Sequence, residues 1–151
     1  MIERAKVLSQ QDGCWALPIS GFEVFQCKVD YAFTLAFSVG ASGGSRPPWY
    51  ELRLEGPFSC DIAGVAHSLD PEHAPAPVSL APALALFKQQ VTTAKALRNG
   101  VVRIEFDGGD VLEAGPDPSR QFEAWTFSGE GVVMVCLPTG EIWVSQKAAP
   151  I

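Results

Sequence analysis

Apolar and polar residues alternate with a period of two along much of this chain, which is the pattern of strands in a sheet with one buried face. The longest such run begins at Phe25, and its apolar side chains occupy the odd positions as far as Val39. Fully extended at about 3.3 Å per residue, the run would span about 50 Å, which is wider than a small domain. The sequence therefore predicts a reversal near Asp30 and two strands.

Shorter runs of the same kind follow, separated by residues typical of turns. Asn99-Gly100 suits a type I′ hairpin turn, and Asp107 to Asp110 predicts a second hairpin turn. The run at 132–137 is apolar on both faces, so it is expected in the interior of a sheet. Strands are expected at 49–54, 58–66, 91–97, 102–106, 111–114, 122–127, 132–137 and 141–145.

One helix is expected between these strands. Ser79 can act as its N-cap, and Pro82 is tolerated in the first turn. Upstream, four prolines within 68–82 exclude regular structure and predict a surface loop at 68–78. The apolar stripe expected on the helix consists of Leu80, Leu84, Phe87 and Val91.

These elements predict an α+β fold, mainly antiparallel, with one short helix packed on a strongly bent or barrel-like sheet. The 151 residues are the usual size of one domain and can bury a core without disulfides or metals. We therefore expect a single domain over 1–151, in which the weakly patterned residues 1–13 form a frayed leader.

The charge of the chain is low and uneven. Charged residues make up 19% of the sequence and the net charge is −6, with eight acidic and three basic side chains in residues 101–151. Nucleic-acid binding is disfavoured because phosphate contacts need Lys and Arg. An acidic surface instead suits a basic protein partner, and few surface charges are compatible with a homodimer. The residues assigned to partner contact are Glu105, Asp107, Asp110, Glu113 and Trp143.

Nothing in the sequence predicts export, a membrane span or a bound metal. The N-terminal residues alternate in charge and lack an apolar signal segment, and no apolar run is long enough to cross a bilayer. The cysteines lie far apart, so reduced thiols, a cytoplasmic location and no cofactor are expected. The four cysteines are Cys14, Cys27, Cys60 and Cys136.

A carboxylate close to aromatic residues is the first candidate for chemistry. On a strand, Glu123 shares a face with Trp125 and Phe127. If that face is buried, Glu123 must be paired with an arginine, hydrogen-bonded or protonated, and a raised carboxyl pKa marks a functional pocket. If Phe122 faces inward instead, Glu123 is exposed. The residues assigned to such a ligand pocket are Glu123, Trp125, Tyr50 and Arg103.

A second candidate lies beside the proline-rich loop, where titratable side chains are densest. His67, Asp70, Glu72 and His73 are residue types that hold metals or transfer protons. Their spacing matches no known site, so a solvated loop is the favoured interpretation.

The C-terminal half resembles a family of small bacterial proteins of unknown function. The resemblance is carried by residues 121–125, with the aromatic-Glu-Ala-Trp pattern, and by 135–142, where a strand ends in Pro138-Thr139-Gly140. Residues 102–108 are similar to the strand and turn that precede this motif. The Pro-Thr-Gly turn departs from the expected Pro-Gly-Gly, and the insert at 71–77 is unfamiliar. The resemblance implies an accessory product, such as an immunity protein that neutralises a toxin or the product of a mobile cassette.

Together these features favour a non-catalytic protein that binds a protein partner, such as a basic toxin. The alternative is a small-molecule pocket protein or small enzyme that uses Glu123 and Trp125. The sequence contains no active-site motif that would indicate a reaction.

Overall fold

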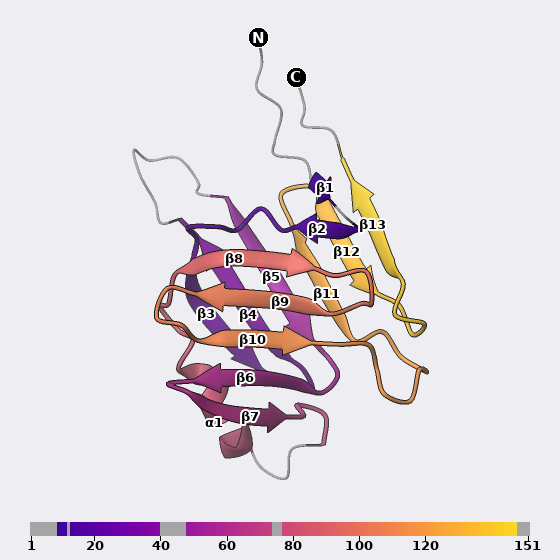
Figure 1. Cartoon of the computed structure of the whole chain (residues 1–151). Coiled ribbons are helices and arrows are strands. Elements are labelled where there is room, and N and C mark those ends of the chain that lie inside the picture. Colours follow the sequence, from indigo (N-terminus) through magenta and orange to yellow (C-terminus); the bar gives the residue numbers. More distant parts are fainter. Residues whose placement is uncertain (1–8, 12, 40–47, 74–76, 148–151) are drawn as a thin grey trace.

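Two antiparallel sheets face each other across one hydrophobic core in the computed structural model, which describes residues 9–11, 13–39, 48–73 and 77–147 (Figure 1). Sheet A contains, in spatial order, β1 (Ser9–Gln11), β2 (Cys14–Ala16), β8 (Val91–Ala96), β9 (Val102–Phe106), β10 (Val111–Ala114), β6 (Phe58–Ile62) and β7 (Val65–Leu69). Sheet B contains β13 (Ile142–Gln146), β12 (Val132–Cys136), β11 (Trp125–Gly129), β5 (Trp49–Leu54), β4 (Phe33–Ser38) and β3 (Glu23–Val29). In Figure 1 the strands of sheet A run across the front, and those of sheet B run steeply behind them.

The expectation of an α+β fold with a barrel-like sheet is wrong. Neither sheet closes on itself, because sheet A ends at β1 and β7 and sheet B ends at β13 and β3. Helix in the described residues is limited to a 3₁₀ turn, η1 (Pro77–Leu80), and one turn of α-helix, α1 (Ala81–Leu84). The fold is therefore mainly β. Alternation with a period of two shows that a strand has one buried face. Strands of a barrel and strands of two stacked sheets alternate in the same way, so the pattern does not distinguish these two architectures.

The expected helical stripe is also wrong in its spacing. Leu84 and Phe87 are 47% and 43% exposed, whereas Leu80, Ala83 and Leu86 are buried. The backbone N–H of Leu86 donates to the carbonyl of Ala83, and other residues of this segment make the same bond to the third residue before them. A 3₁₀ arrangement has three residues per turn, so side chains three apart share a face. Val91, the last residue of the expected stripe, is buried in β8 instead.

Most of the strand predictions are confirmed. The long run reverses at Asp30, whose carboxylate accepts a hydrogen bond of 2.7 Å from the backbone N–H of Ala32. The run at 58–66 is two strands rather than one, joined by Ala63-Gly64 with φ of +51° and +82°. These angles are those of a type I′ hairpin turn. The predicted strand at 122–127 begins only at Trp125.

Residues 132–137 lie in the interior of sheet B, as expected, but the strand of that sheet that is buried on both faces is β4. β12 does lie between two neighbours, but Val133 on its outer face is 37% exposed. Every residue of β4 is buried. Its outward side chains are small, and long charged side chains from the adjacent strands cover them, as in the 2.8 Å ion pair between Lys28 of β3 and Glu51 of β5.

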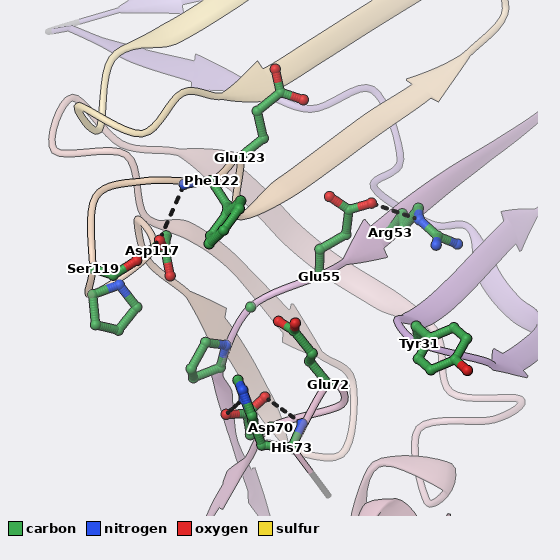
Figure 2. A pocket seen from close by; sticks show the side chains of 13 residues that line it. Tyr31, Arg53, Glu55, Asp70, Glu72, His73, Asp117, Ser119, Phe122 and Glu123 are labelled. Carbon is green, nitrogen blue, oxygen red and sulfur yellow. Dashed lines mark hydrogen bonds and ion pairs between the residues drawn. The ribbon is translucent and has the colours of Figure 1, made fainter.

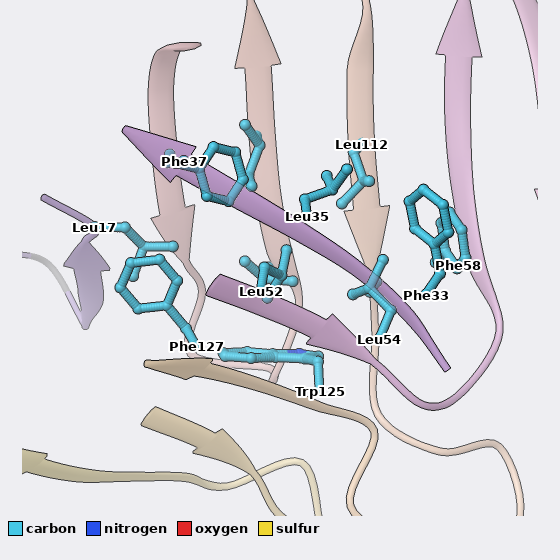
Figure 3. Close-up of a cluster of buried hydrophobic side chains, with 14 of the residues drawn as sticks. Leu17, Phe33, Leu35, Phe37, Leu52, Leu54, Phe58, Leu112, Trp125 and Phe127 are labelled. Atoms are coloured by element: carbon cyan, nitrogen blue, oxygen red, sulfur yellow. The ribbon is translucent and has the colours of Figure 1, made fainter. Parts of the chain in front are cut away.

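Side chains from the inner faces of both sheets form the core (Figure 3). Phe33 of β4 stacks on Phe58 of β6 with ring centroids 5.6 Å apart, and this pair joins the two sheets. Tyr50 stacks on Phe127 at 5.3 Å within sheet B. Aromatic pairs of this kind contribute about 0.5–1.5 kcal/mol each beyond their buried area.

Three hairpins of the C-terminal half share one turn geometry, which differs from the type I′ turn expected at Asn99-Gly100. In the first, the N–H of Leu97 donates to Val101 at 2.7 Å and the N–H of Gly100 donates to Leu97 at 3.0 Å. Only the last loop residue, Gly100, has positive φ, at +89°. This is a three-residue loop that ends in a left-handed glycine. The turns at 107–109 and 138–140 repeat the pattern.

The leader expected at 1–13 is only partly described. Residues 1–8 and 12 lie outside the described residues, and Ser9–Gln11 form β1, which pairs with β2. In the predicted loop at 68–78, residues 74–76 lie outside the described residues, while 68–69 complete β7 and Pro77 begins η1. The described helical elements are four residues each, too short to cross a membrane.

Candidate acidic groove

A groove of about 560 Å³ lies where connections pass from one sheet to the other (Figure 2). The β5–β6 connection and the β10–β11 connection form its walls, and residues after β7 together with the β3–β4 reversal complete it. We call it the acidic groove; it is lined by Tyr31, Arg53, residues 55–57, Asp70, residues 72 and 73, residues 117–119, and residues 122 and 123.

Negative charge dominates the lining of the acidic groove. Five carboxylates face one guanidinium, so negative charges exceed positive ones by four when His73 is neutral. Arg53 donates to Glu55 at 3.1 Å, and His73 Nδ1 lies 3.0 Å from Asp70. Within the described residues, the side chains of Glu72 and Glu123 make neither hydrogen bond nor ion pair. The five carboxylates belong to Glu55, Asp70, Glu72, Asp117 and Glu123.

Two aromatic side chains are exposed in the groove, and one is held in place by a hydrogen-bonded loop. Tyr31 is 85% exposed and Phe122 is 64% exposed. The Asp117 carboxylate accepts the backbone N–H groups of Gln121 and Phe122 at 3.1 and 3.2 Å, and also the hydroxyl of Ser119 (Figure 2). The hydrogen bond from Ser119, followed by the one from Gln121, lowers the pKa of Asp117. The loop therefore presents Phe122 to solvent in a defined position.

The groove shows no activated nucleophile. Ser119 shares it with the Asp70–His73 pair, but the Ser119 hydroxyl donates to Asp117 and not to the imidazole. Outside the groove, in the core, burial raises the pKa of Cys60 and of Cys136 to about 11, so both thiols stay protonated at neutral pH. Within the described part of the chain, no three His, Cys, Asp or Glu side chains are arranged to hold a metal ion. The arrangement is suited to binding positive charge.

The residues assigned to a ligand pocket are not brought together. Glu123 is exposed in the acidic groove, whereas Trp125 is fully buried and Tyr50 is 5% exposed, both in the core. Arg103 lies on the outer face of sheet A, where it donates to Glu113 at 2.7 Å. Glu123 precedes β11, and the next residue, Ala124, is buried with its carbonyl accepting the N–H of Glu55. A pocket made from these four side chains does not exist in this fold.

The residues assigned to partner contact are also scattered, and none lines the acidic groove. Glu105 and Glu113 both bind Arg103 on the outer face of sheet A. Asp107 is exposed in a hairpin turn, and Trp143 is 50% exposed on β13. Sequence reasoning missed Tyr31, Phe122 and Asp117 as groove residues. Of the loop cluster, Asp70, Glu72 and His73 line the groove, and His67 lies half-buried on β7.

Asp110 has a structural role instead of a partner contact. It is 9% exposed and accepts hydrogen bonds from the Ala63 N–H at 2.9 Å and from Gln89 Nε2 at 2.7 Å. The carboxylate thus ties the β6–β7 turn to the segment after α1.

Replacing Asp110 by alanine should lower the free energy of unfolding by about 1–3 kcal/mol, because the N–H groups of Ala63 and Gln89 both lose their acceptor in partly buried hydrogen bonds. Denaturant unfolding measures the change. Asp107→Ala, three residues away in the exposed turn, is the matched control and should stay within about 0.5 kcal/mol of the wild type. Equal effects of the two substitutions would contradict the structural role.

Comparison with known proteins assigns the chain to a family but names no activity. No curated protein and no solved structure matches the chain. A family model does match residues 15–146, which extend from within β2 to the end of β13 and include the whole acidic groove. This agrees with the resemblance to an uncharacterised family in the sequence analysis. The chain belongs to a family of unknown function, DUF6188.

Proposed function

We propose that this protein is a non-catalytic binding protein that holds a basic segment of a protein partner in the acidic groove. The observation that carries the proposal is the lining itself, with five carboxylates against one guanidinium and two exposed aromatic rings. An exposed Phe122 held by a hydrogen-bonded loop is typical of a contact residue, because apolar side chains exposed together mark interaction sites.

The chemistry of the groove favours Lys and Arg side chains. Within the described part of the chain Glu72 and Glu123 make no ion pair, so a partner's cation would meet them without breaking a contact seen there. A cation over the face of Phe122 or Tyr31 contributes about 0.5–1 kcal/mol at such exposed sites. Complementary charge also speeds association, which salt then slows.

Neutralisation of a basic toxin is the form of this function that the family resemblance implies. A toxin held in this way would form a complex of one to one stoichiometry. The groove supports a basic partner of any kind, and the toxin role rests on the resemblance.

The proposal is tested by capture from a lysate of the source organism, followed by titration with the captured protein once mass spectrometry has identified it and it has been purified. Glu72→Lys/Glu123→Lys should weaken binding by about tenfold or more, because two favourable charge contacts become repulsive. Asp61→Lys/Asp107→Lys is the matched control, since it makes the same change in net charge on exposed residues outside the groove. It should bind like the wild type.

Phe122→Ala should also weaken binding of that partner while leaving the charge unchanged. Equal binding by the groove variant and the control variant would reject the acidic groove as the binding site. A captured partner without a basic segment would reject the proposed recognition.

A further inference from the structure

We propose that the basic segment of the partner, held in the acidic groove, continues as an added strand along the edge of β7. The inference rests on the proposed function and specifies how the partner binds. β7 is the last strand of sheet A, and β6 is its one neighbour among the described strands (Figure 1). Antiparallel pairing is slightly more stable per residue than parallel pairing, and the neighbours of β6 and β7 all use it, so the added strand is expected to run antiparallel to β7.

The backbone of β7 presents hydrogen-bonding groups at this edge. Ile62 and Val65 directly flank a two-residue turn, so they form a hydrogen-bonded pair, and such pairs alternate along an antiparallel ladder. The N–H and C=O groups of Ala66 and Ser68 therefore point away from β6. Both residues are exposed, and no described residue bonds to these backbone groups. An added strand would pair all of them.

The composition of β7 leaves this edge open to pairing. Edge strands usually carry charges, prolines or bulges that prevent the addition of another strand. Val65–Leu69 contain neither charge nor proline, and their pairing with β6 has no bulge. Val65 is also 56% exposed, and an added strand would cover part of it.

The edge of β3 also leads toward the groove, but part of it is already occupied. β3 carries a bulge between Val24 and Gln26, and both backbone groups of Val24 bond to residues 88 and 89. A bulge also twists an edge away from a regular ladder. β7 is therefore the better template for an added strand.

The chain leads directly from β7 into the acidic groove. The strand ends at Leu69, and the chain then turns, with the Asp70 carboxylate accepting the backbone N–H of His73 at 3.3 Å. Asp70, Glu72 and His73 line the groove (Figure 2). An antiparallel partner strand begins beside Leu69, so the residues that precede it continue toward these carboxylates. The geometry predicts a partner with Lys or Arg residues just before an extended run, and not after it.

Two peptides of identical composition test this polarity. The first is Lys-Arg-Lys-Thr-Val-Thr-Val-Thr and the second is Thr-Val-Thr-Val-Thr-Lys-Arg-Lys, both acetylated and amidated so that terminal charges do not contribute. The full chain is titrated with each peptide up to about 1 mM and followed by NMR, which covers Kd values up to that range. The first peptide should bind about tenfold more tightly, because only it can occupy β7 and the groove together.

Amide hydrogen exchange locates the added strand. In the free protein the N–H groups of Ala66 and Ser68 should exchange rapidly. When the first peptide occupies about nine-tenths of the chains, their exchange should slow about tenfold, because only the free chains exchange. The N–H of His67 already points at β6, so its exchange is the internal reference.

Ser68→Pro removes an outward donor and leaves the ladder with β6 in place, since edge strands tolerate proline where the N–H faces solvent. It should weaken binding of the first peptide by about tenfold, because a hydrogen bond is lost and the ring blocks the edge. Ser68→Ala is the matched control, which loses the same hydroxyl but keeps the N–H, and it should bind like the wild type. Thermal unfolding checks that Ser68→Pro folds, and if it does not, exchange in the wild type decides.

The outcomes separate this inference from the proposed function. Equal binding of the two peptides, weakened in both cases by Glu72→Lys/Glu123→Lys, would overturn the added strand and keep the groove as a site for basic segments. Unchanged exchange of Ala66 and Ser68 in the saturated complex would also overturn it. Slowed exchange with an affinity that the double substitution does not change would reject the groove, and with it the proposed function. If neither peptide binds, the added strand is wrong, since backbone pairing and charge attraction need no particular partner sequence.

Discussion

Trp125→Ala is expected to lower the free energy of unfolding by about 3–5 kcal/mol, which is the range for a large aromatic removed from a core. A domain of this size has only about 5–15 kcal/mol in total. Trp125 is fully buried on the inner face of sheet B (Figure 3). Its Nε1–H donates to the carbonyl of Gly100 at 2.9 Å, and Gly100 belongs to the β8–β9 loop of sheet A. The substitution removes packing and a hydrogen bond between the sheets together.

Two further variants separate those contributions in denaturant unfolding. Trp125→Phe keeps most of the buried ring but loses the donor, so the Gly100 carbonyl is left unpaired at a cost of about 1–3 kcal/mol. Trp143→Ala removes the same side chain from a half-exposed position and should cost less than about 1 kcal/mol. If Trp125→Ala proved no more damaging than Trp143→Ala, the central position of Trp125 would be refuted.

The segment Phe122-Glu123-Ala124-Trp125 serves both the fold and the acidic groove. Trp125 joins the two sheets, and Ala124 is buried with its carbonyl bonded to the N–H groups of Glu55 and Gly56. The two residues before them, Phe122 and Glu123, line the groove. Four consecutive residues therefore couple the position of the groove wall to the core.

The strands could be predicted from sequence because their alternation is a local property. Residues 50–54 alternate between apolar and charged side chains, and the apolar Tyr50, Leu52 and Leu54 are buried. The sheet to which a strand belongs is a long-range property that alternation does not encode. β5 and β6 are adjacent in the chain, yet they belong to opposite sheets. The sequence therefore predicted the elements and not the two-sheet architecture.

The acidic groove could not be predicted from the sequence for the same reason. Its walls come from connections about 60 residues apart in the chain, and they meet only because β5–β6 and β10–β11 both cross between the sheets. The sequence predicts Phe122 as the first residue of a strand at 122–127, and its exposure departs from the usual preference of phenylalanine for burial. The local signal in the sequence is Asp117 between two prolines, because an Asp side chain can accept hydrogen bonds from the backbone that follows it. The structure contains these bonds, from the N–H groups of Gln121 and Phe122.

Gly100→Ala is the second change for which a large effect is expected. It should lower the free energy of unfolding by about 2–5 kcal/mol, from backbone strain and overpacking together. The residue has a φ of +89°, a conformation that costs about 1–2 kcal/mol for a residue with a Cβ. A Cβ at this position would also lie 2.6 Å from the carbonyl oxygen of Gly140. That oxygen is fixed in the 138–140 turn, so the two turns would have to separate, and the Gly100 carbonyl would move away from Trp125.

Gly109→Ala is the matched control, because it isolates the strain from the clash. Gly109 closes the same kind of three-residue loop with a φ of +93°, and no atom lies within 4 Å of its added Cβ. Gly109→Ala should lower the free energy of unfolding only by the cost of the strain, about 1–2 kcal/mol. The difference between the two variants in denaturant unfolding measures how tightly the 98–100 and 138–140 turns are packed. Equal losses would show that the turns can separate freely, and the contact between Trp125 and Gly100 would then not be held by the second turn.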